Sequence, residues 1–236
     1  SFNKQQVFDY TNIPFYVLLG LIIGFITIYY ARWFQKIEHF FTRYEKKPYK
    51  RALIAASFLA VLIFIIPTLF GEGYESIKIL SESNPGVLLQ DTLFSEFKDN
   101  KWVLLAFVGA AAFLKVFATG FTLGGGGNGG NFAPSLFLGS YVGYFFSQLI
   151  TLSGISKLPV SNFTIVGMAG VLSGLFHAPL TAIFLIAEIT GGYSLMIPLM
   201  IVSSISFAVS KRFEKHSMDV KRLAKRGDVF TSNKDT

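Results

Sequence analysis

A glycine run divides the most apolar part of this chain. Six of the seven residues at 124–130 are glycine, and Asn131, Phe132, Ala133 and Pro134 follow directly. The run should break a helix, because glycine loses more backbone freedom on ordering than any other residue. It lies between two apolar segments, 102–123 and 135–152, and irregular backbone at membrane depth occurs only where protein buries it or where it lines a water-filled cavity. Since proline suits the first turn of a helix, we expect a hinge that delivers a helix N-terminus to membrane depth, where its unbonded N–H groups would attract an anion.

Composition also indicates a membrane protein. Of the 236 residues, 52% are hydrophobic and 15% are charged, and the mean hydropathy is +0.51. Soluble domains carry about 25% charged residues. The absence of cysteine excludes disulfides, thiolate metal sites and cysteine nucleophiles. The sequence opens with Ser1 rather than Met and shows no signal-peptide pattern, so we expect it to be a piece of a longer polypeptide.

Several apolar runs approach or exceed the roughly 20 residues that a spanning helix needs. They are 13–34, 52–70, 102–120, 132–152 and 163–209. The last run is too long for one helix, and its glycines and prolines divide it into expected helices at 161–175, 178–190 and 194–211. A shorter helix is expected at 74–82, within a polar stretch. Short helices beside long ones are common in transporters.

The net charge of +7 is distributed unevenly. Lysine and arginine crowd 32–51 and 211–226, whereas acidic residues gather in 71–101, so the positive-inside rule places the two basic stretches in the cytoplasm. We expect an integral, multi-pass protein of a plasma or inner membrane. Its expected regions are an extramembrane lead-in at 1–12, a transmembrane repeat at 13–212 and a basic, cytoplasmic C-terminal helix and tail at 213–236. Because the basic residues directly flank apolar spans, membrane lipid is their expected partner, and nucleic acid is not.

The residues around the glycine run resemble a family motif. Gly130-Asn131-Phe132-Ala133-Pro134 resembles the G-x-F-x-P motif of the CLC chloride channels and proton–chloride antiporters, and the match continues to Gly139. Further matches follow in the family's order at 167–170, 178–182 and 188–198. The resemblance implies an all-α, polytopic transmembrane protein with broken and half-spanning helices, of which this chain is the second of two inverted repeats. The first-half motifs G-S-G-x-P and G-[KR]-E-G-P do not occur in it.

The resemblance also implies an anion site. In the family, backbone amides at the x and F of the motif hold a central chloride, and the matching positions are Asn131 and Phe132, with Gly130, Ala133 and Pro134 completing the motif. A family tyrosine near the start of the last helix gives its hydroxyl to the same ion. Met218, or its neighbour Ser217, stands in that region here as the candidate inner gate. Since methionine cannot donate a hydrogen bond, this departure weakens the gate but leaves the amide site untouched.

Other polar residues have simpler explanations. Glu188 is expected to be a buried, hydrogen-bonded carboxylate that braces Gly191-Gly192 rather than a proton relay. Lys115 either raises the local anion potential or pairs with a carboxylate. The three histidines lack metal-ligand spacing, and His177 is expected to cap a helix. No lysine of a phosphate loop lies near the glycine run, so we expect no metal, no cofactor and no catalytic residue, and hence no enzyme.

The expected function is therefore transport. The first hypothesis is a proton-coupled chloride antiporter, with chloride and protons as its partners. The alternative is a passive channel for chloride or another anion. A non-transporting membrane scaffold ranks third, because it has no need for six glycines at membrane depth. The family implies a homodimer whose interface helices are those at 178–190 and 194–211. We also expect a β-branched residue at Gly130 to distort the loop and abolish anion flux.

Overall fold

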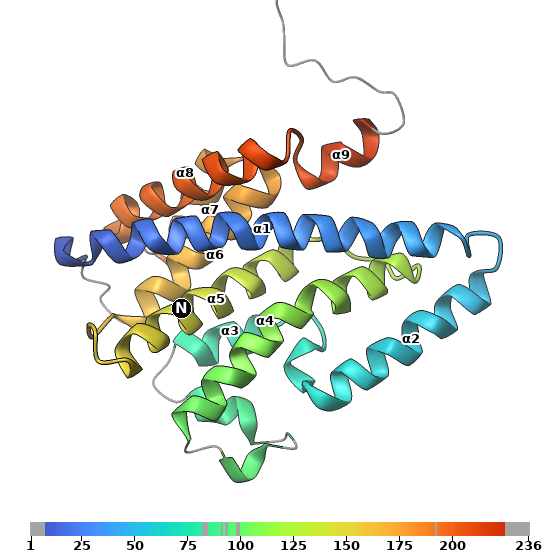
Figure 1. The fold of residues 1–236 in the computed structure, drawn as a ribbon, viewed down its shortest axis with the longest axis horizontal. Coiled ribbons are helices and arrows are strands. Elements are labelled where there is room, and N and C mark those ends of the chain that lie inside the picture. The colour runs from blue at the N-terminus through green and yellow to red at the C-terminus, as the bar shows by residue number, and fades with distance from the viewer. Residues whose placement is uncertain are drawn as a thin grey trace, which may run out of the picture.

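The computed structural model describes residues 8–81, 85–90, 92, 94–97, 100–191 and 193–224. All regular structure in these ranges is helical (Figure 1), which confirms the all-α class. The α-helices are α1 (Ile13–Thr42), α2 (Pro48–Ile65), α3 (Tyr74–Ser81), α4 (Lys101–Gly124), α5 (Phe132–Leu152), α6 (Val160–Phe176), α7 (Pro179–Thr190), α8 (Met196–Phe213) and α9 (Met218–Ala224). Several predicted segments lie partly outside the described residues: residues 1–7 of the lead-in at 1–12, residues 225–236 of the C-terminal region at 213–236, Gly192, and Glu82 at the end of the 74–82 helix.

The described helices include spanning and shorter elements, as the sequence predicts. Five segments are long and apolar enough to cross a membrane, namely Tyr10–Thr42, Pro48–Ile65, Lys101–Gly124, Phe132–Leu152 and Tyr193–Lys221. The helix α7 has only 12 residues, and at about 1.5 Å per residue it is roughly 18 Å long, well short of the hydrocarbon core. The chain therefore combines whole and partial membrane helices.

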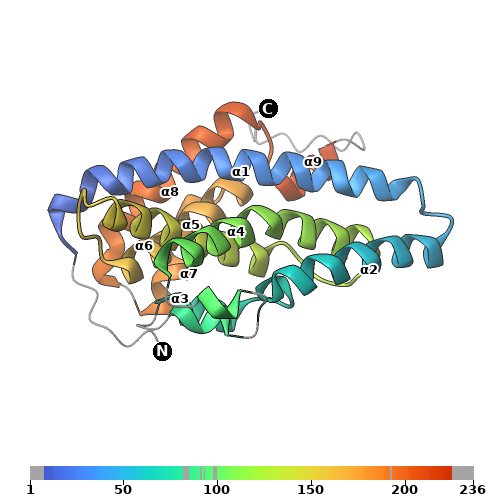
Figure 2. The ribbon, with the colours of Figure 1, turned by 60° about the horizontal axis from the view of Figure 1, so that its bottom comes forward.

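The helix α1 continues beyond its expected end at residue 34 to Thr42. The added turns are fixed by packing rather than by hydropathy, because Ile37 and Phe41 are buried against Ala55 of α2 in a small cluster separate from the main core. The helix α4 lies between α1 and α2 (Figures 1 and 2) and contacts both of them. This corner of three helices borders the glycine run.

The centre of the molecule is the contact between α5 and α6. Every residue of α6 from Asn162 to Leu175 is buried. Glycines let the two backbones approach, since a Cβ at Gly139 would lie 2.5 Å from the carbonyl oxygen of Gly167, and one at Gly143 would lie 2.1 Å from that of Phe163. Small residues at helix contacts allow this kind of close approach in membranes. The helices α1 and α8 also contact α6. The helix α6, supported in this way, holds α5 in place.

The break between α6 and α7 lies at His177. This residue is the C-cap of α6 and has a left-handed backbone with φ of +55°, which is uncommon for a residue other than glycine. Pro179 then occupies the first turn of α7, where its missing N–H has no intrahelical acceptor. The expected capping position of His177 is thereby confirmed.

We expect Gly143→Ala to lower the melting temperature of the purified protein. The added methyl group would approach a backbone carbonyl at 2.1 Å, and backbone atoms cannot rotate away as a side chain can. Overpacking a core costs about 1–3 kcal/mol, and so short a contact places this variant at the upper end. Gly130→Ala is the matched control, because a Cβ there would meet no atom of this chain within 4 Å. Equal melting temperatures for the two variants would contradict this account of the α5–α6 contact.

Candidate functional site

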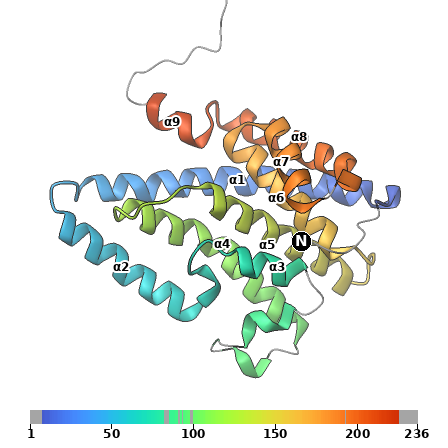
Figure 3. The ribbon, with the colours of Figure 1, turned by 180° about the vertical axis from the view of Figure 1, so that it is seen from behind.

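The glycine run ends one helix and leads to the next. Gly124 is the last residue of α4, and α5 begins at Phe132, so residues 125–131 form a loop that we call the hinge loop. Figure 3 shows it leaving the end of α4 beside α2 and crossing back to the start of α5. Gly126 has φ of +101°, a conformation that residues other than glycine rarely adopt. The predicted break in the helix is confirmed.

The N-terminus of α5 keeps its first amides uncapped by a side chain. Asn131 is the N-cap residue, but its side chain makes no capping hydrogen bond. Its Oδ1 instead accepts a hydrogen bond from the Tyr30 hydroxyl of α1 at 3.3 Å. The backbone N–H of Ser135 donates to the Asn131 carbonyl at 3.0 Å, whereas the amides ahead of it lie in the first turn, where a helix offers no acceptor. These amides carry the positive end of the helix dipole.

The five residues of the predicted anion site lie together at this helix end. Gly130 is exposed, the Phe132 side chain is 40% exposed, and Asn131, Ala133 and Pro134 are half-buried. Pro134 is the third residue of α5 rather than its first, but it still lies in the first turn. From Ser135 to Tyr144 every residue is buried. The first three residues of α5 are thus the accessible part of this half of the helix.

Gly130 itself is not crowded within this chain. A Cβ there would meet nothing within 4 Å, and its φ is not in the left-handed region. The expected distortion of the loop by a larger residue at this position therefore has no steric basis in the described residues. The crowded glycines are earlier in the run, at Gly124, Gly125 and Gly127, where an added Cβ would lie 2.4 to 2.7 Å from another atom.

The candidate inner gate lies on the last described helix. Met218 begins α9, is 6% exposed and belongs to the main hydrophobic cluster. Ser217 is half-buried, and its carbonyl accepts a hydrogen bond from the Lys221 amide. The helix α9 contacts α6, which places Met218 on the same core that supports α5. The role of these two residues as a gate stays a prediction.

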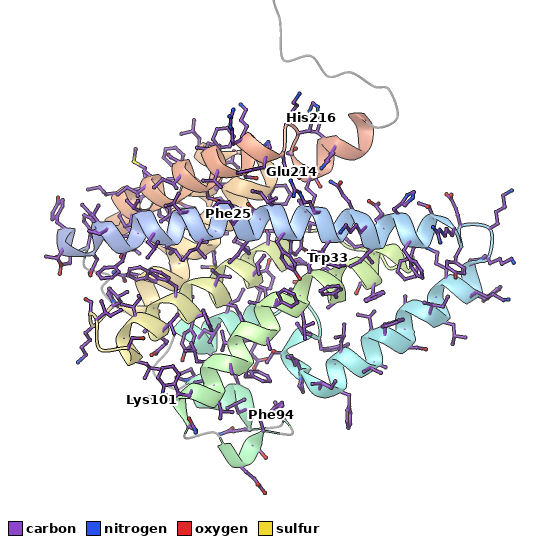
Figure 4. All side chains as sticks on the ribbon, viewed as in Figure 1. Phe25, Trp33, Phe94, Lys101, Glu214 and His216 are labelled. Atoms are coloured by element: carbon purple, nitrogen blue, oxygen red, sulfur yellow. The ribbon has the colours of Figure 1, made fainter. Side chains whose placement is uncertain are left out.

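An ion-pair network that the sequence did not reveal attaches this last helix. Glu214 follows α8 directly and is 8% exposed. Its carboxylate accepts hydrogen bonds from Arg32 of α1, at 2.9 Å, and from Lys221 of α9. Figure 4 shows Glu214 at the end of α8, close to α1. A carboxylate at a helix C-terminus opposes the dipole, so the two cations are what make the position favourable.

Two other charged residues differ from their expected settings. Lys115 is 2% exposed, and its ammonium donates to the carbonyls of Leu69 and Gly71 and lies 4.2 Å from the centre of the Phe137 ring. Among the described residues its partners are thus carbonyls and a π face rather than a carboxylate, and the other alternative, that Lys115 raises the local anion potential, stays a prediction. Glu188 is exposed rather than buried, and it accepts a hydrogen bond from the Tyr193 hydroxyl. This hydrogen bond joins α7 to the segment that leads into α8, and it lies at the surface.

These features define a class of protein: a polytopic helical membrane protein in which a half-buried helix N-terminus faces an irregular, glycine-rich loop. Residues 1–211 match the family model described as "Voltage gated chloride channel". The chain belongs to this family, which confirms the resemblance drawn from the hinge motif.

Named relatives agree with this assignment. The chain is 28% identical over 201 residues to the H(+)/Cl(-) exchange transporter ClcA of Vibrio cholerae, covering 83% of this chain and 39% of the relative. It is 27% identical over 223 residues to chloride channel protein CLC-e of Arabidopsis thaliana, covering 86% and 29%. The chain thus spans well under half the length of these relatives.

Two solved structures share the fold. One is a slow cyanobacterial Cl-/H+ antiporter, with a TM-score of 0.67 and 21% identity, covering 95% of this chain and 49% of that one. The other is a CLC-type fluoride/proton antiporter, with a TM-score of 0.64 and 21% identity, covering 89% and 47%. The polytopic helical fold is confirmed by these similarities.

Proposed function

We propose that this chain forms the second half of a proton-coupled chloride antiporter, in which the backbone amides of Asn131 and Phe132 hold the anion. The observation that carries the proposal is the uncapped, accessible N-terminus of α5 at the end of the hinge loop. It is supported by relatives that are named H(+)/Cl(-) exchange transporters and by a structural neighbour that is a Cl-/H+ antiporter. Protons are the second transported species in this proposal.

The chemistry of this helix end suits a transported anion. The first-turn amides and the helix dipole supply roughly half a positive charge without a fixed cation. Binding by amides is strong enough to replace part of the anion's hydration, and weak enough to let it leave, which conduction requires. The buried contact of α5 with α6 holds the helix that carries the Phe132 amide in a fixed direction.

A passive anion channel is the second candidate. It is favoured by Met218, which stands near the expected position of the family's tyrosine and is buried as an apolar residue. A thioether offers no hydroxyl to close the inner side of the site. One plant relative carries the name chloride channel protein.

A coupling assay separates these candidates. The complete native transporter is reconstituted in liposomes, a chloride gradient is imposed, and internal pH is followed with a dye. We expect chloride flux to drive protons against their own gradient. Chloride flux without proton movement would establish the channel instead, and a reconstituted protein that moves no anion would contradict the proposed function.

A proline substitution tests the amide site directly. Asn131→Pro removes one N–H, and the φ of −88° at this position is close to what proline adopts. We expect the chloride dissociation constant, measured by titration calorimetry, to rise roughly tenfold or more, because a hydrogen bond to a charged group contributes about 1.5–3 kcal/mol. Asn131→Ala is the matched control, since it deletes the side chain but keeps the amide. If both variants bind chloride equally, the backbone of residue 131 is not a ligand.

We also propose that the transporter is a homodimer and that its subunits meet at α7 and α8. These helices expose a set of large apolar side chains, which comprises Leu180, Phe184, Ile189, Ile197 and Met200. A cysteine at Leu180, which is 69% exposed, should crosslink between two copies in membranes, whereas one at Phe58 of α2 should not. Crosslinking at neither position would argue against this interface. The proposal also places the basic stretches 32–51 and 211–226 in the cytoplasm, which labelling from one side of the membrane tests.

A further inference from the structure

The last four carbonyls of α4 all find partners outside the regular helix. The Gly125 amide donates to Phe121 at 2.8 Å, the Gly127 amide to Thr122 at 2.9 Å and the Gly126 amide to Leu123 at 3.2 Å. The carbonyl of Gly124 accepts from Nε of Arg51 at 2.5 Å. Helix ends normally leave four such carbonyls without an intrahelical partner. Three are therefore satisfied by the run's own glycines, and the fourth depends on a side chain from α2.

The contact with Arg51 joins a tightly packed corner. A Cβ at Gly124 would lie 2.5 Å from the Phe41 ring of α1, and a Cβ at Gly125 would lie 2.4 Å from Cβ of Ala55 of α2. The ring of Phe58 stacks on that of Phe121, with centroids 4.8 Å apart. The end of α4 thus fits closely against both helices, and Arg51 adds a positive charge where the helix dipole is negative.

Beyond this corner the hinge loop is held by the amides of Gly126 and Gly127 on α4 and then runs exposed to α5. Residues 126–130 are exposed, and glycine has the largest conformational freedom to lose on ordering. At its far end the loop is tied by the hydrogen bond from Tyr30 to Asn131. The exposed segment 126–130 therefore lies between two side-chain contacts: Arg51 of α2 on Gly124, just before the loop, and Tyr30 of α1 on Asn131, at its end.

We propose that Arg51 is a positioning residue for the anion site. It fixes the point at which the hinge loop leaves α4. A fixed starting point restricts the conformations of the loop, and so the direction of the Asn131 amide at the start of α5. Arg51 does not touch the anion in this proposal, and its effect passes through the loop. The inference rests on the proposed function, because it concerns the same amides.

The test compares two substitutions that remove the same charge. Arg51→Gln deletes the guanidinium that holds Gly124, whereas Lys50→Gln deletes an exposed neighbour. In the reconstituted complete transporter we expect Arg51→Gln to raise the chloride concentration for half-maximal flux by up to about tenfold, which is within what the loss of one hydrogen bond from a charged donor can transmit through the loop. The maximal rate should change less than about threefold. Lys50→Gln should match the wild type. Arg51→Lys, which keeps a charged donor but not its fork, should give an intermediate value.

A second readout does not depend on transport. This chain has no cysteine, so Asn128→Cys adds one label to it, in the middle of the exposed loop. Mass spectrometry of the peptide that holds residue 128 separates this label from cysteines elsewhere in the complete transporter. We expect the labelling rate to rise severalfold when Arg51→Gln is added and to stay unchanged with Lys50→Gln. Equal labelling rates with Arg51→Gln and Lys50→Gln would overturn the positioning role. Faster labelling with Arg51→Gln but an unchanged chloride concentration for half-maximal flux would overturn it too. If the wild type moves no anion at all, the proposed function fails and the inference fails with it, whereas transport with equal half-saturation in both variants overturns the inference alone.

Discussion

The close contact between α5 and α6 is the constraint on which the site depends. Gly139, Gly143 and Gly167 bring the two backbones so near that each added Cβ would lie 2.1 to 2.5 Å from a backbone atom of the facing helix. Without a hydrophobic driving force between helices in lipid, such packing is the main source of association. It leaves α5 few ways to shift, because α6 is itself buried along nearly its whole length. The direction of the first-turn amides of α5 is thus set by the core rather than by a ligand.

The two helix ends that flank the hinge loop differ in how their backbone groups are paired. The carbonyls at the end of α4 are all paired, by three glycine amides and by Arg51. The amides at the start of α5 receive no side-chain cap, and the residue in the capping position turns its Oδ1 toward Tyr30. A cap on these amides would compete with an anion for the same donors. The paired end therefore anchors the loop, while the uncapped end keeps its electrostatic attraction for a ligand.

Local signals in the sequence predict the breaks in the chain well. Helices end at the glycine run and at His177, and α7 begins at Pro179, as these residues predict. The apolar runs predict where the long helices lie. Contacts between distant segments were not predictable in this way. The extension of α1 to Thr42 depends on Ile37 and Phe41 meeting Ala55, and the pairing of Glu214 with Arg32 and Lys221 joins residues up to 182 positions apart. The apolar neighbours of Glu188 predict an interior position, but the residue is exposed, because an apolar helix of a membrane protein can also face lipid.

The accessible first turn of α5 and the buried stretch from Ser135 to Tyr144 behind it fit the proposed site, shared between two halves. In the proposed function this chain supplies one side of the site, namely the amide donors, the helix that carries them and the core behind it. The exposed ring of Phe132 and the exposed hinge loop are the surfaces that a facing repeat would cover. Since irregular backbone in a bilayer must be covered by protein or line a wet cavity, the loop's exposure itself calls for such a partner. When the amides of this chain are held in place, any group that moves to admit or release the anion can come from the facing repeat. Such an arrangement suits a site that must bind an anion and then release it.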